Sequence, residues 1–257
     1  MEQKQYYEGL KNPDAAIVQK SHPLKMLAHS SLSLCELKIL DMYCGRINSR
    51  NSDIRTVKFK KGDIENALGI KRIRKEELKA RVSALFMPIT LDDWCTEQSE
   101  GFVMQVLFER IACTKVGNQW EVEMTCTENA KELFFNLENI GYIKYRLKNV
   151  LKLTSRYSYN LFLHLIDSPK RNMRIELPML KNILGCKSEK YTEFKYFNRD
   201  ILKKTCNEIN EKTDINVEYK SYYTHGNTIA GIEFTISPKN EIDFTKFRPL
   251  DTSENIS

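Results

Sequence analysis

The sequence has no long apolar run and few turn-forming residues, and each absence excludes a class of protein. No stretch of about 18 apolar residues occurs, so no membrane-spanning helix is predicted. The first residues, MEQKQYYEGLKNPDAA, contain no apolar segment of the kind found in signal peptides. With 10 glycines and 7 prolines in 257 residues, the composition is not that of a disordered or fibrous chain.

The seven cysteines are odd in number and scattered, with no CxxC pair and no histidine at metal-ligand spacing. We therefore expect them to be reduced packing residues of a cytoplasmic protein, with a reactive thiol as the open alternative. Hydrophobic residues make up 41 % of the chain, which is enough for one large domain or two ordinary ones.

Signatures of catalysis are also missing. The chain has four histidines and no HxH pair, so it cannot build the usual metal centre of a rolling-circle replication nuclease. The closely spaced tyrosines Tyr157 and Tyr159, and Tyr142 and Tyr145, are therefore interpreted as packing residues. No GxxxxGK[ST] loop, GxSxG turn or HExxH helix occurs. The sequence predicts no enzyme, no metal and no cofactor.

Positive charge is concentrated in two segments. The net charge of the whole chain is +6. Residues 55–81 hold ten basic and four acidic residues, which is also +6, and residues 187–204 hold six basic and three acidic residues, which is +3. Phosphate binding requires such clustering, although two solvated helix faces would have the same composition.

The order of predicted elements occurs twice along the chain. The first copy has helix 32–47 with a capping box of Ser33 and Glu36, followed by a strand, a short helix, a second helix and a hairpin. These later elements are expected at 56–60, 62–69, 74–87 and around Gly117-Asn118. The second copy is expected at 155–167, 173–177, 178–185, 193–210 and in the strands INVEY and IAGIEFTIS, on either side of His225-Gly226-Asn227.

The two short helices also resemble each other in sequence. IENALG aligns with LKNILG, so that Asn66, Leu68 and Gly69 match Asn182, Leu184 and Gly185 at an offset of 116 residues. A short helix that ends at glycine, a second helix and a hairpin together form a winged helix-turn-helix. We therefore predict the α+β class with two tandem winged-helix domains. The expected boundaries are a loose arm over 1–30, domains over 31–135 and 136–238, and a tail over 239–257.

The second long helix offers the best candidates for reading DNA. An apolar face is predicted at Phe194, Phe197, Ile201, Leu202, Thr205, Cys206 and Ile209. The opposite face carries Lys195, Tyr196, Asn198, Arg199, Lys203 and Asn207. Lys195, Asn198 and Arg199 are the base-reading candidates, because arginine can bind guanine and asparagine can bind adenine through two hydrogen bonds. Lys187, Ser188, Lys190 and Lys203 are expected to hold phosphates.

The equivalent helix of the first copy is more densely basic. Its predicted core face is Leu78, Val82, Leu85 and Phe86. Around that face lie Lys71, Arg72, Arg74, Lys75, Lys79 and Arg81. Few of these residues discriminate between bases, so contact with the DNA backbone is favoured, with a solubilising surface as the alternative.

The phrase YTEFKYFNRDILKKTCNEINEKTDINVEYK resembles the second winged helix of the iteron-binding plasmid replication initiators, which replicate by the theta mode. The segments LSLCELKILDMYCGRI, LKARVSALF and SRYSYNLFLHLID are also similar to that family, and the likeness covers about residues 30–238. It implies two winged-helix domains joined by a long helix, in a bacterial protein that binds directly repeated double-stranded DNA at a plasmid origin.

The same resemblance implies the partners and the division of labour. Family members bind the repeats as monomers and repress their own gene as dimers, which predicts a homodimer in equilibrium with monomer. The first domain supplies the dimer contact and the second domain the principal reading of the major groove. Opening of adjacent DNA needs no nucleotide, and the host initiator ATPase and replicative helicase are recruited.

Asp200 departs from the family pattern, because a carboxylate stands where basic residues are expected. It could face away from DNA, accept a hydrogen bond from cytosine or weaken the contact. Three other functions remain open at this point: a winged-helix repressor without origin function, a relaxase-like enzyme, and a module that binds protein instead of DNA.

Overall fold

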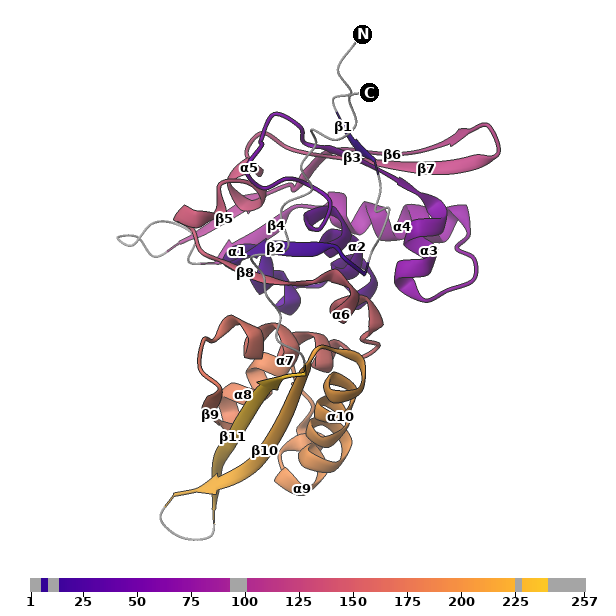
Figure 1. Cartoon of the computed structure of the whole chain (residues 1–257). Coiled ribbons are helices and arrows are strands. Elements are labelled where there is room, and N and C mark those ends of the chain that lie inside the picture. The colour runs from indigo at the N-terminus through magenta and orange to yellow at the C-terminus, as the bar shows by residue number, and fades with distance from the viewer. Residues whose placement is uncertain (1–5, 9–13, 93–100, 225–227, 240–257) are drawn as a thin grey trace. The chain divides into compact units, whose positions relative to one another are not determined.

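The computed structural model describes residues 6–8, 14–92, 101–224 and 228–239, and the chain divides into two compact units (Figure 1). The first unit contains the residues up to Leu151, and the second unit begins at Lys152. The hairpin tip at His225–Asn227, most of the predicted tail and residues 93–100 lie outside the described residues. No helix in the part of the chain that is described combines the length and apolar character needed to cross a membrane.

The first unit is built around helix α2 (Leu34–Cys44) and a four-stranded sheet of order β1-β3-β7-β6. Strand β1 pairs with β3 in parallel, and the other pairs of this sheet are antiparallel. The remaining elements are β1 (Tyr6–Glu8), β2 (Ile17–Ser21), α1 (His22–Met26), η1 (Leu27–His29), β3 (Thr56–Lys60), α3 (Lys61–Leu68), α4 (Lys75–Phe86), β4 (Ile89–Asp92), β5 (Phe102–Gln105), β6 (Phe108–Val116), β7 (Gln119–Cys126), α5 (Lys131–Phe134), η2 (Leu137–Asn139), β8 (Tyr142–Arg146) and α6 (Leu147–Lys152).

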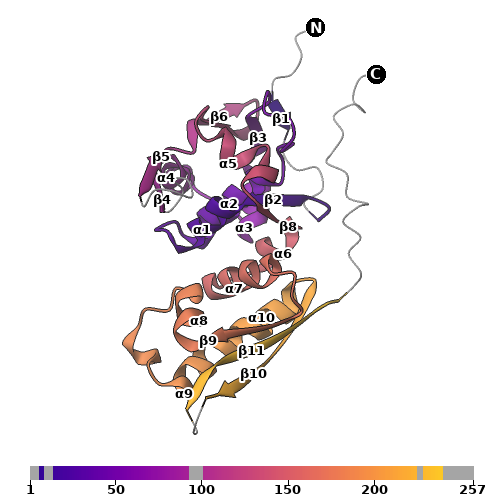
Figure 2. The same ribbon diagram turned by 90° about the vertical axis from the view of Figure 1, so that its left-hand side faces the viewer.

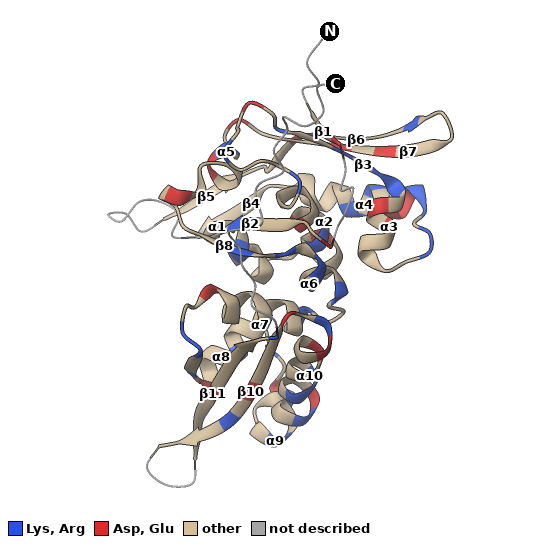
Figure 3. Cartoon of the chain, viewed as in Figure 1, with Lys and Arg blue, Asp and Glu red and all other residues tan. Residues whose placement is uncertain are grey.

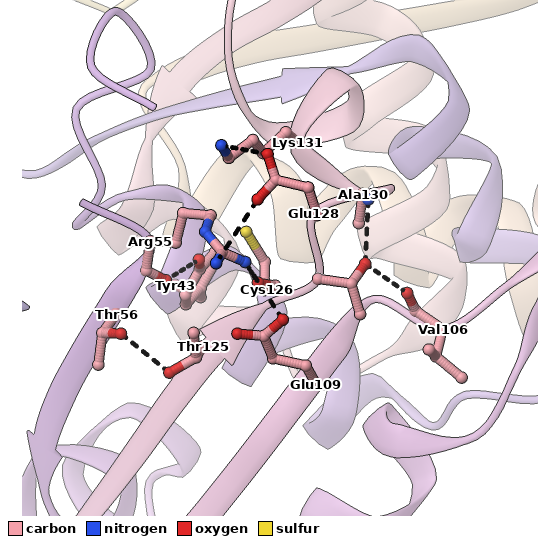
Figure 4. Close-up of polar contacts among 11 residues, drawn as sticks. Tyr43, Arg55, Thr56, Val106, Glu109, Thr125, Cys126, Glu128, Ala130 and Lys131 are labelled. Carbon is pink, nitrogen blue, oxygen red and sulfur yellow. Dashed lines mark hydrogen bonds and ion pairs between the residues drawn. The ribbon is translucent and has the colours of Figure 1, made fainter. Parts of the chain in front are cut away.

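The sheet is closed onto α2 by an aromatic cluster and by Arg55. The Tyr43 ring packs edge-on against Phe108 and Phe134, with centroids 5.0 and 5.1 Å apart, a favoured aromatic geometry. The Tyr43 hydroxyl donates to the Arg55 carbonyl, and the Arg55 guanidinium forms ion pairs with Glu109 at 3.3 Å and Glu128 at 3.6 Å (Figure 4). These contacts fix the start of β3 against β6 and the end of β7.

The second unit repeats this plan with a three-stranded antiparallel sheet of order β10-β11-β9. Helices α8 and α10 pack against that sheet (Figures 1 and 2). Its elements are α7 (Arg156–Asp167), β9 (Asn172–Glu176), α8 (Leu177–Leu184), η3 (Glu189–Tyr191), α9 (Phe194–Phe197), the π-helical turn η4 (Asn198–Leu202), α10 (Lys203–Lys212), β10 (Ile215–Tyr223) and β11 (Ile229–Pro238). The predicted order of elements is confirmed in the second unit. In the first unit, the additional hairpin of β4 and β5 lies between α4 and β6.

The short helices α3 and α8 end in the same way. Gly69 and Gly185 both adopt φ 69° and ψ 29°, the left-handed conformation that glycine tolerates best. The Gly69 amide donates to the backbone carbonyl of Asn66 at 3.1 Å, and the Gly185 amide donates to that of Asn182 at 2.8 Å. Asn66 and Asn182 are one of the pairs in the sequence alignment of the two short helices. The repeat predicted from sequence is therefore a repeat of backbone conformation.

The prediction of a loose arm over 1–30 is wrong for the described part of that segment. Strand β2 pairs antiparallel with β8, from Ile17 opposite Arg146 to Ser21 opposite Tyr142. Val18 and Leu24 are fully buried. Pairing across more than 120 residues of sequence leaves no local pattern, and the polar composition of the segment concealed it.

Two other boundaries differ from expectation for related reasons. Because β8 pairs with β2, the division between the units lies after Leu151 instead of after residue 135. The long connecting helix implied by the family resemblance is interrupted, since α6 ends at Lys152 and α7 begins at Arg156. Ser155 caps α7, its side chain accepting the Tyr157 amide at 3.2 Å, so the polar residues between the helices start a new helix.

Glu208 anchors this break to helix α10. Its carboxylate accepts hydrogen bonds from the Thr154 amide at 2.7 Å, the Thr154 hydroxyl at 2.6 Å and the Ser155 amide at 3.3 Å. Lys212 lies 2.8 Å away on the same helix. Burial acts to raise the pKa of Glu208, but the hydrogen bonds from Lys212 and Thr154 outweigh it and lower the pKa to about 2.

We predict that Gly69→Ala lowers the free energy of unfolding of the first unit by about 1–2 kcal/mol, because an L-residue is strained at positive φ. The added methyl group meets no neighbour within 4 Å, so the effect comes from the backbone alone. Urea unfolding followed by tryptophan fluorescence measures it, since both tryptophans, Trp94 and Trp120, precede residue 151. Gly62→Ala is the matched control: it also has open space but lies within α3, so it should be neutral or stabilising. Equal destabilisation by both variants would contradict the prediction.

We also predict that Glu208→Gln destabilises the second unit by about 2 kcal/mol at pH 7, because charge-assisted hydrogen bonds are lost. A lowered pKa stabilises the fold above the unfolded value of 4.5, and that contribution disappears as pH falls towards 2. The difference from wild type should therefore shrink across this range in urea unfolding followed by circular dichroism. Glu211→Gln, an exposed change on the same helix, should leave the curve unaltered. A pH-independent difference for Glu208→Gln would contradict the account.

Candidate nucleic-acid interface

The predicted two faces of the long helix are confirmed in the second unit. Phe197, Ile201, Leu202, Thr205, Cys206 and Ile209 are buried, and Phe194 is half-buried. On the other side Lys195, Arg199, Lys203 and Asn207 are exposed, and Tyr196 and Asn198 are half-buried. The sequence periodicity therefore assigned the outward residues of this helix correctly.

The helix is not a regular α-helix along its whole length. Residues Asn198–Leu202 form a π-helical turn between α9 and α10. A π-turn accommodates one extra residue and is frequent at functional sites. No sequence signal predicted it, because the apolar spacing remains compatible with an ordinary helix.

Asn198 is held by the hairpin. Its side-chain carbonyl accepts a hydrogen bond from the Tyr219 hydroxyl of β10 at 2.8 Å. Bidentate recognition of adenine needs both the carbonyl and the amino group of asparagine, so this bond leaves Asn198 less available than the sequence suggested. Tyr219 was missed by sequence reasoning, since nothing in the chain indicates which strand residue meets the helix.

Asp200 is surrounded by basic side chains. Its two carboxylate oxygens lie 2.8 Å from Nε and 3.0 Å from Nη2 of Arg199, and Lys190 approaches to 3.3 Å. The hydrogen bond from Arg199 holds the pKa of Asp200 well below its usual range, so the group stays ionised. With both oxygens engaged, the carboxylate is less available to accept from cytosine than the sequence suggested.

The remaining candidates of the second unit precede or follow this turn. Lys187, Ser188 and Lys190 are exposed between α8 and α9, and Lys203 is exposed at the start of α10. Lys190 Nζ also lies 5.4 Å from the centre of the Tyr191 ring. These lysines can reach a phosphate without losing a buried contact.

In the first unit, basic residues gather at the start of α4 (Figure 3). Arg72, Arg74 and Lys75 line a cavity of about 650 Å³ together with Lys61 and Trp120. The Lys75 ammonium lies 5.8 Å from the centre of the Trp120 ring, which comes from β7. Lys71 and Lys79 are exposed in the same segment. Sequence reasoning missed Lys61 and Trp120, because the topology of the sheet brings the hairpin to the helix.

Arg81 and Phe86 have surroundings that the sequence did not indicate. The Arg81 guanidinium forms ion pairs with Glu77 at 3.0 Å and Glu36 at 3.6 Å, so it is committed to contacts with α4 and α2. Phe86 was predicted to belong to the core face, but it is 44 % exposed at the end of its helix. Leu78, Val82 and Leu85 are buried as predicted. No group of three potential metal-ligating side chains occurs among the residues that the structure describes.

Comparison with known proteins identifies the family. A family model described as "Initiator Replication protein, WH1" matches residues 17–166, and one described as "Initiator Rep protein, WH2" matches residues 176–236. The chain belongs to the initiator replication protein family. This confirms the predicted family of plasmid replication initiators and the α+β fold of two tandem winged-helix domains. The first match begins at Ile17, the first residue of β2.

Among solved structures, this initiator is similar to one described as "Crystal structure of Pi initiator protein in complex with iteron DNA". The TM-score is 0.65 with 17 % sequence identity, and the match covers 88 % of this chain and 99 % of that chain. At 17 % sequence identity, this structural similarity is evidence for the fold alone. No curated protein sequence is a significant match.

We predict that Lys75→Ala weakens binding of this initiator to specific and random DNA by the same factor. A lysine that contacts phosphate contributes counterion release, so the slope of log affinity against log salt should fall by about one. Titrations at several salt concentrations measure both quantities. Lys170→Ala, in the exposed loop between α7 and β9, is the control and should leave the slope unchanged. A loss confined to specific DNA would contradict the assignment of Lys75 to the backbone.

Proposed function

We propose that this initiator binds directly repeated sequences at a plasmid origin and thereby starts replication. The observation that carries the proposal is the duplication of the winged helix, with an exposed basic helix in each copy. The family matches support a role in initiation, and the solved relative with the same fold is an initiator bound to iteron DNA. Two helices on one chain suit a site that spans more than one groove of the duplex.

The two units have different tasks in this proposal. The second unit reads bases through Lys195 and Arg199, supported by Tyr196, while Lys187, Ser188, Lys190 and Lys203 hold phosphates. Asn198 has a smaller role, because Tyr219 occupies part of its hydrogen-bonding capacity. The first unit contacts the backbone through Lys71, Arg72, Arg74, Lys75 and Lys79, joined by Lys61, and Arg81 acts as a structural ion pair.

The first unit also supplies the contact between two copies of the chain. Large exposed apolar side chains within the described residues are more frequent there than in the second unit. Phe86, Met87, Phe102 and Met104, at the end of α4 and on β5, are between 44 and 64 % exposed. Apolar surface of this kind is typical of protein–protein interfaces. The dimer represses the gene of the initiator, and the monomer binds the repeats.

Initiation follows from binding alone in this proposal, without catalysis or a nucleotide. Bound copies deform the repeats and assist the opening of neighbouring DNA, where the host initiator ATPase and replicative helicase assemble. The bacterial cytoplasm, where these partners are found, is the expected location.

A mobility-shift experiment on a fragment from upstream of the gene, with random DNA as competitor, tests the proposal. We expect a ladder of discrete complexes that survives the competitor, because several repeats fill one after another. A single complex would favour a simple repressor. Equal binding to upstream and random DNA would contradict sequence-specific recognition altogether.

A further inference from the structure

Arg199 is an exposed side chain with an unusually fixed position. Its side chain is 60 % exposed, yet two nitrogen atoms of the guanidinium are bonded to both oxygens of Asp200. The guanidinium carbon also lies 5.3 Å from the centre of the Tyr196 ring, within the range of a cation–π contact. A long side chain that would otherwise sample many rotamers is thus held from two directions.

The contacts to Asp200 leave a defined set of donors free. A guanidinium carries five N–H donors in a planar fork. Asp200 takes the edge formed by Nε and Nη2, so one Nη1 donor and the second Nη2 donor form a separate edge that Asp200 does not occupy. Two parallel donors on one edge match the N7 and O6 acceptors of guanine in the major groove.

The carboxylate also disfavours the alternative in which Arg199 binds a phosphate. Asp200 stays ionised beside Arg199 and Lys190, so the local charge of these three residues is +1 instead of +2. A phosphate would be repelled by the carboxylate, whereas the neutral edge of a base is not. In this arrangement Arg199 keeps N–H donors that can hydrogen-bond a base, while its electrostatic attraction for the DNA phosphate backbone is reduced.

We infer that Asp200 is a positioning residue that aligns Arg199 for the recognition of one guanine in each repeat. The inference rests on the proposed function and deepens it, because it assigns specificity at one base pair to a pair of neighbouring residues. Lys190, the other partner of the carboxylate, carries a single ammonium group without a planar fork, so it contributes charge and affinity without this discrimination.

The test replaces each guanine of the upstream repeat in turn by 7-deazaguanine, which lacks the N7 acceptor, and measures binding of the full chain. For wild type, one replacement in the repeat should weaken binding about tenfold, the size of a lost bidentate partner. Asp200→Asn keeps the shape of the side chain but loses its charge and one acceptor. In this variant, replacing that guanine should weaken binding by about threefold or less, which is on the order of half of the wild-type loss in binding free energy.

Two further variants separate alignment from folding and from general affinity. Arg199→Lys keeps the positive charge but loses the planar fork, so replacing that guanine by 7-deazaguanine should no longer weaken binding. The double variant with Asp200→Asn should bind the repeat as tightly as Arg199→Lys alone. Lys190→Met should weaken binding to every fragment but keep the loss caused by replacing that guanine. Thermal unfolding by circular dichroism checks that each variant is folded.

The outcomes distinguish this inference from the proposed function. If wild type prefers upstream DNA but Asp200→Asn retains the full loss at that guanine, the positioning role is overturned and the proposed function stands. A uniform loss at all guanines in Asp200→Asn would likewise overturn it, because it indicates lost backbone contact. If wild type shows no preference for upstream DNA, both the inference and the proposed function fail.

Discussion

The architecture depends on one backbone constraint, a left-handed glycine between the two helices of each winged-helix unit. Gly69 and Gly185 share the same φ and ψ, and each places its amide on a carbonyl of the helix that it ends. The turn satisfies backbone groups that would otherwise lack partners, and it sets the direction in which the next helix leaves. Other residues could adopt this conformation only with strain, so the position of the next helix in each unit follows from a residue without a side chain.

Local pattern predicted much of the fold, and the failures share a physical origin. The buried face from Phe197 to Ile209 follows from helical spacing, and the glycine turns follow from their position after a short helix. The pairing of β2 with β8 and the ion pair between Arg81 and Glu36 did not follow, because they join segments far apart in the sequence. Within the candidate site, the pattern identified which residues face outwards. It could not show that Asn198 is bonded to Tyr219 or that Asp200 engages Arg199, since these depend on rotamers and on tertiary packing.

The two units use positive charge differently, and this supports the proposed division of labour. At the start of α4, Arg72, Arg74 and Lys75 gather around one cavity, an arrangement suited to the uniform charge of phosphates. In the second unit Arg199 is partly neutralised and tightly held, which sacrifices attraction for the backbone but retains directed hydrogen bonds. In the proposed function, the first unit contributes affinity alone, whereas the second unit adds specificity to its phosphate contacts. The carboxylate that looked out of place in the sequence belongs to the specific part.

Placing a photo-crosslinking amino acid at Lys195, on the exposed face of α9, tests the central claim most directly. The account predicts crosslinks to bases inside the repeats, at the same position of every repeat, when the full chain is irradiated on upstream DNA. The same amino acid at Lys170 should give no such pattern. Crosslinks from position 195 that are absent, or that are spread evenly along the DNA without regard to the repeats, would contradict the claim that this helix reads the sequence.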